Sequence, residues 1–182
     1  MRLLAISDTH VRQFRELPER VIALFRESDA VIHAGDFTSA EVYESFSRKE
    51  CYAVSGNTDD YELKRALPQE LSFEVEGVRF GLTHRGNYLN QFHDLGYKAK
   101  ELGVDFLIFG HIHRFVLEKF GDVVVLCPGS PTKPRLSAAS VALIEVEDGK
   151  VNVKYELAAP IACGMDVRLG GISDIDDKIE DK

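Results

Sequence analysis

The chain has 182 residues and a net charge of −8, from 22 lysine and arginine side chains against 30 aspartate and glutamate side chains. The length predicts a single domain. Hydrophobic residues make up 45% of the sequence, enough to bury a core, which argues against a disordered chain. The acidic balance disfavours nucleic acid or an anionic membrane as the main partner, because phosphate contacts need lysine and arginine.

The first half alternates strand and helix patterns. Short apolar runs predict strands at residues 3–7, 30–35 and 51–56. Between them, apolar stripes at helical spacing predict helices at residues 18–27 and 39–49, the second capped by Ser39. This βαβαβ order predicts parallel strands joined by right-handed crossovers.

The second half has a different pattern. We expect a hairpin of residues 71–76 and 78–84, a helix at 90–102 ended by Gly103, and an apolar strand at 106–109. Four more strands look like one meander, at residues 115–120, 123–127, 140–147 and 151–157. The layout predicts a mixed sheet, or two packed sheets, with helices outside. Residues 1–157 would form the domain and residues 158–182 a solvated or partly docked tail, with a partner-contact surface as the alternative.

The apolar stretches and the cysteines indicate in which cellular compartment the protein lies. The apolar run after the first residues is too short for a signal peptide, and no stretch approaches the roughly 20 apolar residues of a membrane span. Cys51, Cys127 and Cys163 are far apart and form no CxxC motif, which argues against a zinc ribbon or a disulfide framework. We therefore expect a reduced, cytoplasmic protein without a membrane anchor; the sequence leaves open whether it forms a homo-oligomer.

Polar side chains follow five of the apolar strands, where each strand ends. In open α/β sheets the carboxyl ends of the strands form the edge at which ligands bind. The residues at these ends are carboxylates, imidazoles and one amide, all metal-ligand types: Asp8, His10, Asp36, Asn57, His84, His111 and His113. Each motif alone is a weak signal, because Gly-Asp and Gly-Asn are common turns and His84 alone could be a core imidazole.

The number of candidate ligands favours a dinuclear site. One ion with four to six ligands does not need seven, whereas two ions that share a bridging carboxylate do. Two ions roughly 3.5–4 Å apart suit phosphoester hydrolysis, because they bind phosphoryl oxygens and lower the pKa of a bridging water. We therefore predict a dinuclear metal centre at this sheet edge.

In motif order the chain resembles the calcineurin-like metallophosphoesterase superfamily, and within it the small YfcE-like phosphodiesterase branch. The motifs are Asp8-Thr9-His10, Gly35-Asp36, Gly56-Asn57-Thr58-Asp59, His84 and Gly110-His111-Ile112-His113, followed by Cys127-Pro128-Gly129-Ser130 where the branch usually has Asn-Pro-Gly-Ser. The resemblance covers residues 1 to about 157. It implies an α/β fold, a four-layer α/β/β/α sandwich of two mixed sheets.

The resemblance also implies roles for the ligands. One metal would be held by Asp8, His10, Asp36 and His113, and the second by Asp36, Asn57, His84 and His111, with Asp36 as the bridge. A hydroxide bridging the two ions would attack phosphorus, so Asp36, Asn57 and His84 are the candidate catalytic residues. Manganese is the expected metal, and nickel, zinc, iron or cobalt are alternatives.

Two departures from the family pattern concern the substrate. Thr58 stands where larger members have a histidine thought to protonate the leaving group, and threonine cannot supply a proton near neutral pH. Arg85 replaces a glycine after His84 and could bind a substrate phosphate or be a surface charge. Thr58 and Asp59 are further candidates for substrate contact, although Asp59 could instead order the loop.

Together these features predict a metal-dependent phosphodiesterase or phosphoesterase that acts on a small phosphodiester or phosphomonoester. The alternative is a catalytically weak interaction scaffold on the same fold, like the metallophosphoesterase-like subunit of retromer. A nuclease is disfavoured by the charge of −8. Two histidines lie outside the motifs: we expect His33 in the core or behind the ligands, and His93 on the surface unless its helix overhangs the site as a substitute acid.

Overall fold

The first strand, β1 (Arg2–Ile6), is buried on both faces, and its side chains alternate between two cores. Leu3 and Ala5 join a core that lies between two sheets, whereas Leu4 and Ile6 join one that lies under helices. A strand with apolar residues on both faces must be covered on both sides. This requirement sets the layering of the molecule, which the computed structural model describes for residues 1–85 and 92–159.

Sheet A is built around β1. Parallel partners β2 (Ala30–His33) and β3 (Glu50–Ala53) lie on one side of β1. Antiparallel β9 (Ser140–Glu147) and then β10 (Lys150–Leu157) lie on the other side, so the order is β10-β9-β1-β2-β3. The parallel half matches the βαβαβ unit that the sequence predicts.

Sheet B has the order β4-β5-β6-β8-β7. The predicted hairpin is β4 (Glu70–Val75) with β5 (Val78–Thr83), and β5 pairs in parallel with β6 (Phe106–Phe109). In turn β6 pairs in parallel with β8 (Val123–Pro128), whose antiparallel partner is β7 (Phe115–Phe120). The carboxyl ends of β5 and β6 therefore lie at one edge of this sheet.

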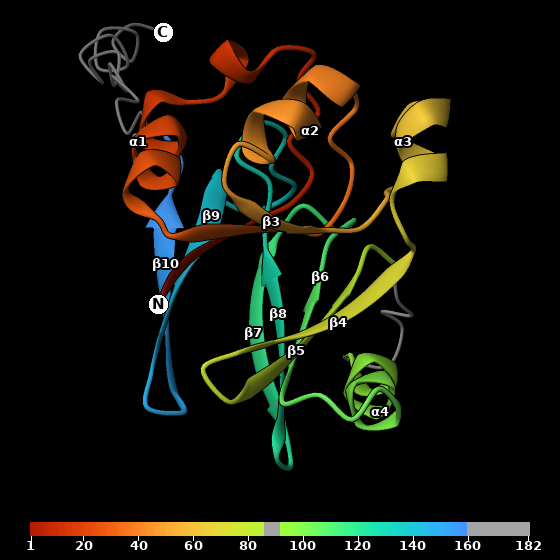
Figure 1. The fold of residues 1–182 in the computed structure, drawn as a ribbon, viewed down its shortest axis with the longest axis vertical. Coiled ribbons are helices and arrows are strands. Elements are labelled where there is room, and N and C mark those ends of the chain that lie inside the picture. Colours follow the sequence, from red (N-terminus) through yellow and green to blue (C-terminus); the bar gives the residue numbers. More distant parts are fainter. Residues whose placement is uncertain (86–91, 160–182) are drawn as a thin grey trace, which may run out of the picture.

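Helices cover the outer faces of both sheets (Figure 1). Helices α1 (Glu19–Glu27) and α2 (Ala40–Phe46) pack on sheet A through a core that includes Leu24 and Phe46. Helix α4 (His93–Glu101) packs on sheet B through Leu95 and Ala99. The predicted α/β/β/α sandwich is confirmed.

The predicted single meander is wrong in its pairing. The β7–β8 hairpin belongs to sheet B and the β9–β10 hairpin to sheet A. The chain leaves β8 through Gly129, at φ +84°, and crosses between the sheets before β9 begins at Ser140. Alternation along a strand indicates which residues are buried, but it does not say which sheet the strand joins.

Helix boundaries differ from the prediction at three places. Ser39 precedes α2 but makes no side-chain cap; its hydroxyl donates instead to the carbonyl of Arg12. Helix α2 ends at Phe46, and the Lys49 ammonium donates to the last carbonyls of α1. Helix α3 (Tyr61–Ala66) was not predicted. It has six residues and buries only Leu63, and it is capped by Asp60, whose carboxylate accepts from the Leu63 amide.

The last strand, β10, ends at Leu157, where the predicted domain ends. Residues 160–182, most of the predicted tail, lie outside the described residues, so the division at residue 157 stays a prediction. In the part of the chain that the structure describes, no helix is long and apolar enough to cross a membrane.

Candidate metal centre

The carboxyl ends of strands from both sheets converge at one edge of the sandwich. β1 leads to Asp8 and His10 and β2 to Asp36, while β6 in the other sheet leads to His111 and His113. All five residues have left-handed backbone, with φ between 44° and 74°. Non-glycine residues rarely adopt this conformation, and such strain clusters at functional sites. The chain turns sharply after each strand and directs these side chains into a shared site.

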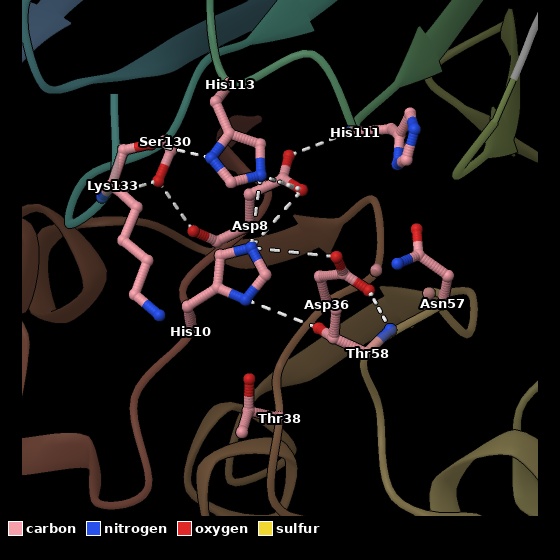
Figure 2. Close-up of polar contacts among 12 residues, drawn as sticks. Asp8, His10, Asp36, Thr38, Asn57, Thr58, His111, His113, Ser130 and Lys133 are labelled. Atoms are coloured by element: carbon pink, nitrogen blue, oxygen red, sulfur yellow. Dashed lines mark hydrogen bonds and ion pairs between the residues drawn. The ribbon is translucent and has the colours of Figure 1, made fainter. Parts of the chain in front are cut away.

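Four of these side chains form a compact cluster (Figure 2). One ligand atom from each of Asp8, His10, Asp36 and His113 lies within 4.8 Å of every other. The two imidazole Nε2 atoms of His10 and His113 are 3.1 Å apart. The Asp8 Oδ1 atom lies 3.2 Å from the His113 Nε2, and the Asp36 Oδ2 lies 3.6 Å from the His10 Nε2. These four residues are the set that the resemblance assigns to the first metal.

Hydrogen bonds behind the rings decide which ring nitrogen faces the cluster. The Nδ1 of His113 lies 2.6 Å from the Lys133 carbonyl oxygen, and the Nδ1 of His84 lies 2.7 Å from that of Ala34. A carbonyl only accepts, so each Nδ1 carries a proton, and each Nε2 is the ring atom directed into the site that would bind a metal. The Nδ1 of His10 lies 3.3 Å from the Thr58 hydroxyl, which is able to accept the Nδ1–H of the tautomer that metal binding through Nε2 would require.

The geometry fits a divalent cation. Asp8 is fully buried, and its Oδ1 has no hydrogen-bond donor among the described residues. Its other oxygen, Oδ2, accepts from the Ser7 hydroxyl at 2.7 Å and from the His111 amide at 2.9 Å. A buried carboxylate oxygen facing imidazole lone pairs is repulsive unless a positive charge lies between them. Carboxylate and imidazole are ligands for zinc, manganese, iron, nickel and cobalt.

The remaining three predicted ligands lie on the other side of Asp36 and are less tightly grouped. The His84 Nε2 is 3.1 Å from the Asn57 Oδ1 and 3.5 Å from the Asp36 Oδ2. The His111 ring lies 5.3 Å from the His84 ring and stands apart from the compact cluster, on the Asn57 side (Figure 2). The structure thus brings Asp36 between the two groups, as a bridging ligand would be.

The electrostatics favour the metal-binding protonation states of Asp36, His10 and His111. Burial would raise the pKa of Asp36, but its hydrogen bond to His84, the charge of that ring, and the Thr58 amide together hold it well below the ordinary value. Burial lowers the pKa of His10 and of His111, and the His84 charge lowers that of His111 further. Asp36 is therefore ionised and these two imidazoles neutral near pH 7, as metal ligands must be. For His84, burial lowers the pKa, but its hydrogen bond to Asp36 and the charges of Asp36 and Asp8 raise it above the ordinary value, so a metal would have to displace a proton there.

Asp59 is a residue whose role the sequence left open. Its carboxylate is buried and accepts from the Gly56 amide at 2.6 Å, the Thr38 amide at 2.8 Å and the Asp36 amide at 3.2 Å. Both oxygens are used in joining the loops that follow β2 and β3. This geometry supports loop ordering rather than the substrate contact that we also considered.

The loop after β8, a strand of sheet B, forms hydrogen bonds to the backbone around Asp8, which follows β1 of sheet A. The Ser130 hydroxyl donates to the Asp8 carbonyl at 2.7 Å, and the Thr132 hydroxyl donates to the Thr9 carbonyl at 2.6 Å. The sequence did not single out Ser7 or Ser130 as contributors to the site. Ser7 precedes the Asp8 motif and Ser130 ends the Cys127–Ser130 motif, and only the fold shows that each hydroxyl donates to Asp8. Cys127, by contrast, is fully buried in the core under α4.

The substrate candidates differ in position. Thr58 and Arg85 are exposed, and the Arg85 Nε donates to the Asn57 Oδ1 at 3.1 Å. His93 is exposed and packs against Phe120, at the end of β7 away from the metal centre, so the substitute-acid role for His93 has no geometric support.

His33 lies behind the ligand loops in a fully buried position, stacked on Phe37. Its Nδ1 accepts from the Gly35 amide at 3.2 Å, so the proton is on Nε2, which lies 3.2 Å from the Thr9 hydroxyl. That hydroxyl in turn donates to the Asp36 carbonyl at 3.4 Å. The imidazole therefore joins the loops of Asp8 and Asp36, as the second of the two expected roles requires.

Burial lowers the pKa of His33 well below its ordinary value. The unfolded chain then binds more protons than the folded one below about pH 6.5, so His33 makes the protein less stable as the pH falls. We expect His33→Gln to reduce the slope of unfolding free energy against pH by up to about 1.4 kcal/mol per pH unit in this range. Urea denaturation of both proteins from pH 7 to pH 5 measures this slope, and an unchanged slope would contradict the assignment.

The chain was compared with known proteins. A family model described as the calcineurin-like phosphoesterase superfamily domain matches residues 1–149. A probable metallophosphoesterase of Methanothermobacter thermautotrophicus is 36% identical over 175 residues, covering 92% of this chain and 99% of the relative. A phosphodiesterase of Methanocaldococcus jannaschii is 26% identical over 164 residues, covering 81% of this chain and 94% of that protein.

Solved structures agree with the fold. A predicted phosphoesterase of Streptococcus pneumoniae superposes with a TM-score of 0.69 at 25% identity, covering 86% of this chain and 89% of its own. Vacuolar protein sorting 29 of Cryptosporidium parvum superposes with a TM-score of 0.68 at 24% identity, covering 85% and 96%. At that identity the second likeness bears on the fold alone.

Proposed function

The chain belongs to the calcineurin-like phosphoesterase superfamily, and we propose that it is a phosphodiesterase that uses two divalent metal ions to hydrolyse a small phosphate ester. Metal-dependent phosphoester hydrolysis follows from the family and from its clustered ligands. The number of ions, the preference for manganese and the small phosphodiester or phosphomonoester substrate are the proposed parts.

One observation carries the proposal. Imidazole lone pairs and carboxylate oxygens converge with no proton donor for the Asp8 Oδ1 among the described residues, and Asp36 lies between His10 and His84. A single ion at the compact cluster would leave the His84 Nε2 and the Asn57 Oδ1, which lie 3.1 Å apart beside Asp36, without a metal to bind. A second ion beside Asp36 would be bound by both of these atoms.

The chain's own residues prepare the site for an anion. Asp8, His10 and His113 would hold one ion, and His84, Asn57 and His111 the other, with Asp36 shared. Bound divalent ions neutralise phosphoryl oxygens and lower the pKa of water, so that hydroxide is present near neutral pH. Seven ligands with two carboxylates leave the loaded site locally positive although the chain is acidic.

The leaving group constrains the substrate. Thr58, at the position of the family's proton donor, places its hydroxyl 3.3 Å from the His10 Nδ1, and a threonine hydroxyl does not ionise near neutral pH to supply a proton. General acid catalysis is worth roughly 10²–10⁴-fold, so esters whose leaving group needs no proton should react best.

Hydrolysis of bis-p-nitrophenyl phosphate tests the function. We expect no turnover after chelation and dialysis, and recovery on addition of Mn²⁺ or another of the candidate divalent metals. Calorimetric titration should give two ions per chain. A protein inactive with every one of Mn²⁺, Fe²⁺, Co²⁺, Ni²⁺ and Zn²⁺ would contradict the proposal. The scaffold alternative is consistent with the likeness to a vacuolar protein sorting protein, but no contact in the site favours it.

A further inference from the structure

A pocket of about 400 Å³ opens beside the Asn57 side of the metal centre. It shares two candidate ligands with the site, Asn57 and His84, so a group in the pocket would be adjacent to a phosphate on the metals. The rest of its lining comes from the loop after β3, helix α3 and the β4–β5 hairpin: Ser55, Gly56, Lys64, Gln69, Glu70, Thr83 and Arg85. The volume is in the range of small-ligand sites.

Two cationic side chains of this lining flank Asn57. The Lys64 ammonium donates to the Asn57 backbone carbonyl at 2.8 Å, and the Arg85 guanidinium donates through Nε to the Asn57 side-chain oxygen at 3.1 Å. Neither forms an ion pair with a residue in the ranges 1–85 and 92–159. The acidic residue of the lining, Glu70, pairs with Lys98. The pocket therefore carries two positive charges that nothing described in the chain neutralises.

The hydrogen-bonding capacity of the two side chains is mostly unused. A guanidinium has five N–H donors and an ammonium three, and each of these groups uses one on Asn57. The other donors have no acceptor among the described residues. Two cations with several unused donors match the double charge and the oxygens of a phosphomonoester better than a carboxylate, which carries one charge.

We propose that this pocket binds a second phosphate of the substrate, held by Lys64 and Arg85 while the scissile phosphate lies on the metals. The substrate class is then a phosphodiester that carries an additional phosphate on the group that enters the pocket. This inference rests on the proposed phosphodiesterase function and narrows its substrate. Lys64 lies on helix α3, and no sequence motif pointed to it.

Two substrates that differ only in the additional phosphate test the pocket. They are the p-nitrophenyl ester of thymidine 5′-phosphate and the same ester with a 3′-phosphate. We expect the wild-type kcat/KM to be at least about tenfold higher for the second, chiefly through a lower KM, because charge-assisted contacts favour binding. A ratio near one, with both esters hydrolysed, would overturn the pocket and leave the phosphodiesterase function standing.

The variants assign the preference to the pocket. In Lys64→Gln the ratio between the two esters should fall to about one or two. Arg65→Gln is the matched control, because Arg65 is the next residue of α3, equally cationic and exposed, and its guanidinium lies over the Tyr61 ring outside the pocket. An equal fall in the control would mean that overall charge, not the pocket, sets the preference.

A binding measurement keeps the two proposals separate. Calorimetry of the Mn²⁺-loaded protein with thymidine 3′,5′-bisphosphate and thymidine 5′-phosphate requires no turnover. We expect wild type to bind the bisphosphate at least about tenfold more tightly than the monophosphate. Lys64→Gln should not show this difference. If neither ester is hydrolysed but this difference remains, the catalytic proposal fails and the pocket stands. Equal affinities would overturn the pocket.

Discussion

The Asp36→Asn variant should hydrolyse bis-p-nitrophenyl phosphate at least about 10³-fold more slowly than wild type. The Asp36 Oδ2 lies 3.6 Å from the His10 Nε2 and 3.5 Å from the His84 Nε2, between the two groups of ligands. In the proposed two-metal site, losing this carboxylate would weaken the binding of both ions at once. Metal stabilisation of the transition state is worth several kcal/mol, and about 4 kcal/mol corresponds to a factor of 10³.

Asparagine also introduces a hydrogen-bond donor at the place where wild type would need a cation. The oxygen of the new amide can still accept from the Thr58 amide, which donates to the Asp36 Oδ1 at 2.8 Å in wild type. Its NH₂ group then faces the lone pairs of His10 and His84 and can donate to both. We therefore expect the metal-free variant to be as stable as wild type while binding fewer ions.

Calorimetric metal titration and thermal unfolding separate these effects. Asp122→Asn is the control, because Asp122 is an exposed aspartate in the β7–β8 turn, far along the strands from the site. The control should retain wild-type turnover and two ions per chain. Turnover of Asp36→Asn within tenfold of wild type would show that Asp36 does not bridge metals.

The sequence places the candidate ligands at strand ends because those positions depend on local patterns. Asp8, Asp36 and His84 each follow an apolar strand, and the carboxyl ends of parallel strands meet at one edge. Apolar residues on both faces of β1 already require cover on both sides. The four-layer arrangement itself came from the family resemblance, since alternation alone left one mixed sheet or two packed sheets open.

What the sequence could not predict depends on contacts between distant segments. Asp59 reads as a loop residue, yet its partners are amides 21 to 23 residues earlier as well as the nearby Gly56 amide. Ser130 acts on Asp8 across 122 residues. Helix α3 has six residues and one buried side chain, too short a pattern for helical periodicity to detect. The pocket cation Lys64 was missed for the same reason.

Gly56→Ala should both destabilise the protein and disable the metal centre. A Cβ at Gly56 would lie 2.1 Å from the Asp36 Oδ1 and 2.2 Å from the Asp36 backbone nitrogen. Neither atom can move freely: the Oδ1 accepts from the Thr58 amide, and the nitrogen donates to Asp59. The Gly56 amide donates to the same Asp59 oxygen, so displacing either loop breaks a buried charge-assisted bond.

We expect Gly56→Ala to cost about 3 kcal/mol of unfolding free energy, at the upper end for overpacking, and about 10²-fold in turnover from a displaced ligand.

Gly149→Ala is the control for backbone strain: its φ is +73° and no atom lies within 4 Å of the added Cβ. It should cost about 1 kcal/mol and leave turnover unchanged. Urea denaturation and bis-p-nitrophenyl phosphate hydrolysis measure both quantities. Equal stability losses in the two variants would mean that the Asp36 loop yields to the methyl group, and wild-type turnover in Gly56→Ala would mean that catalysis tolerates the shift.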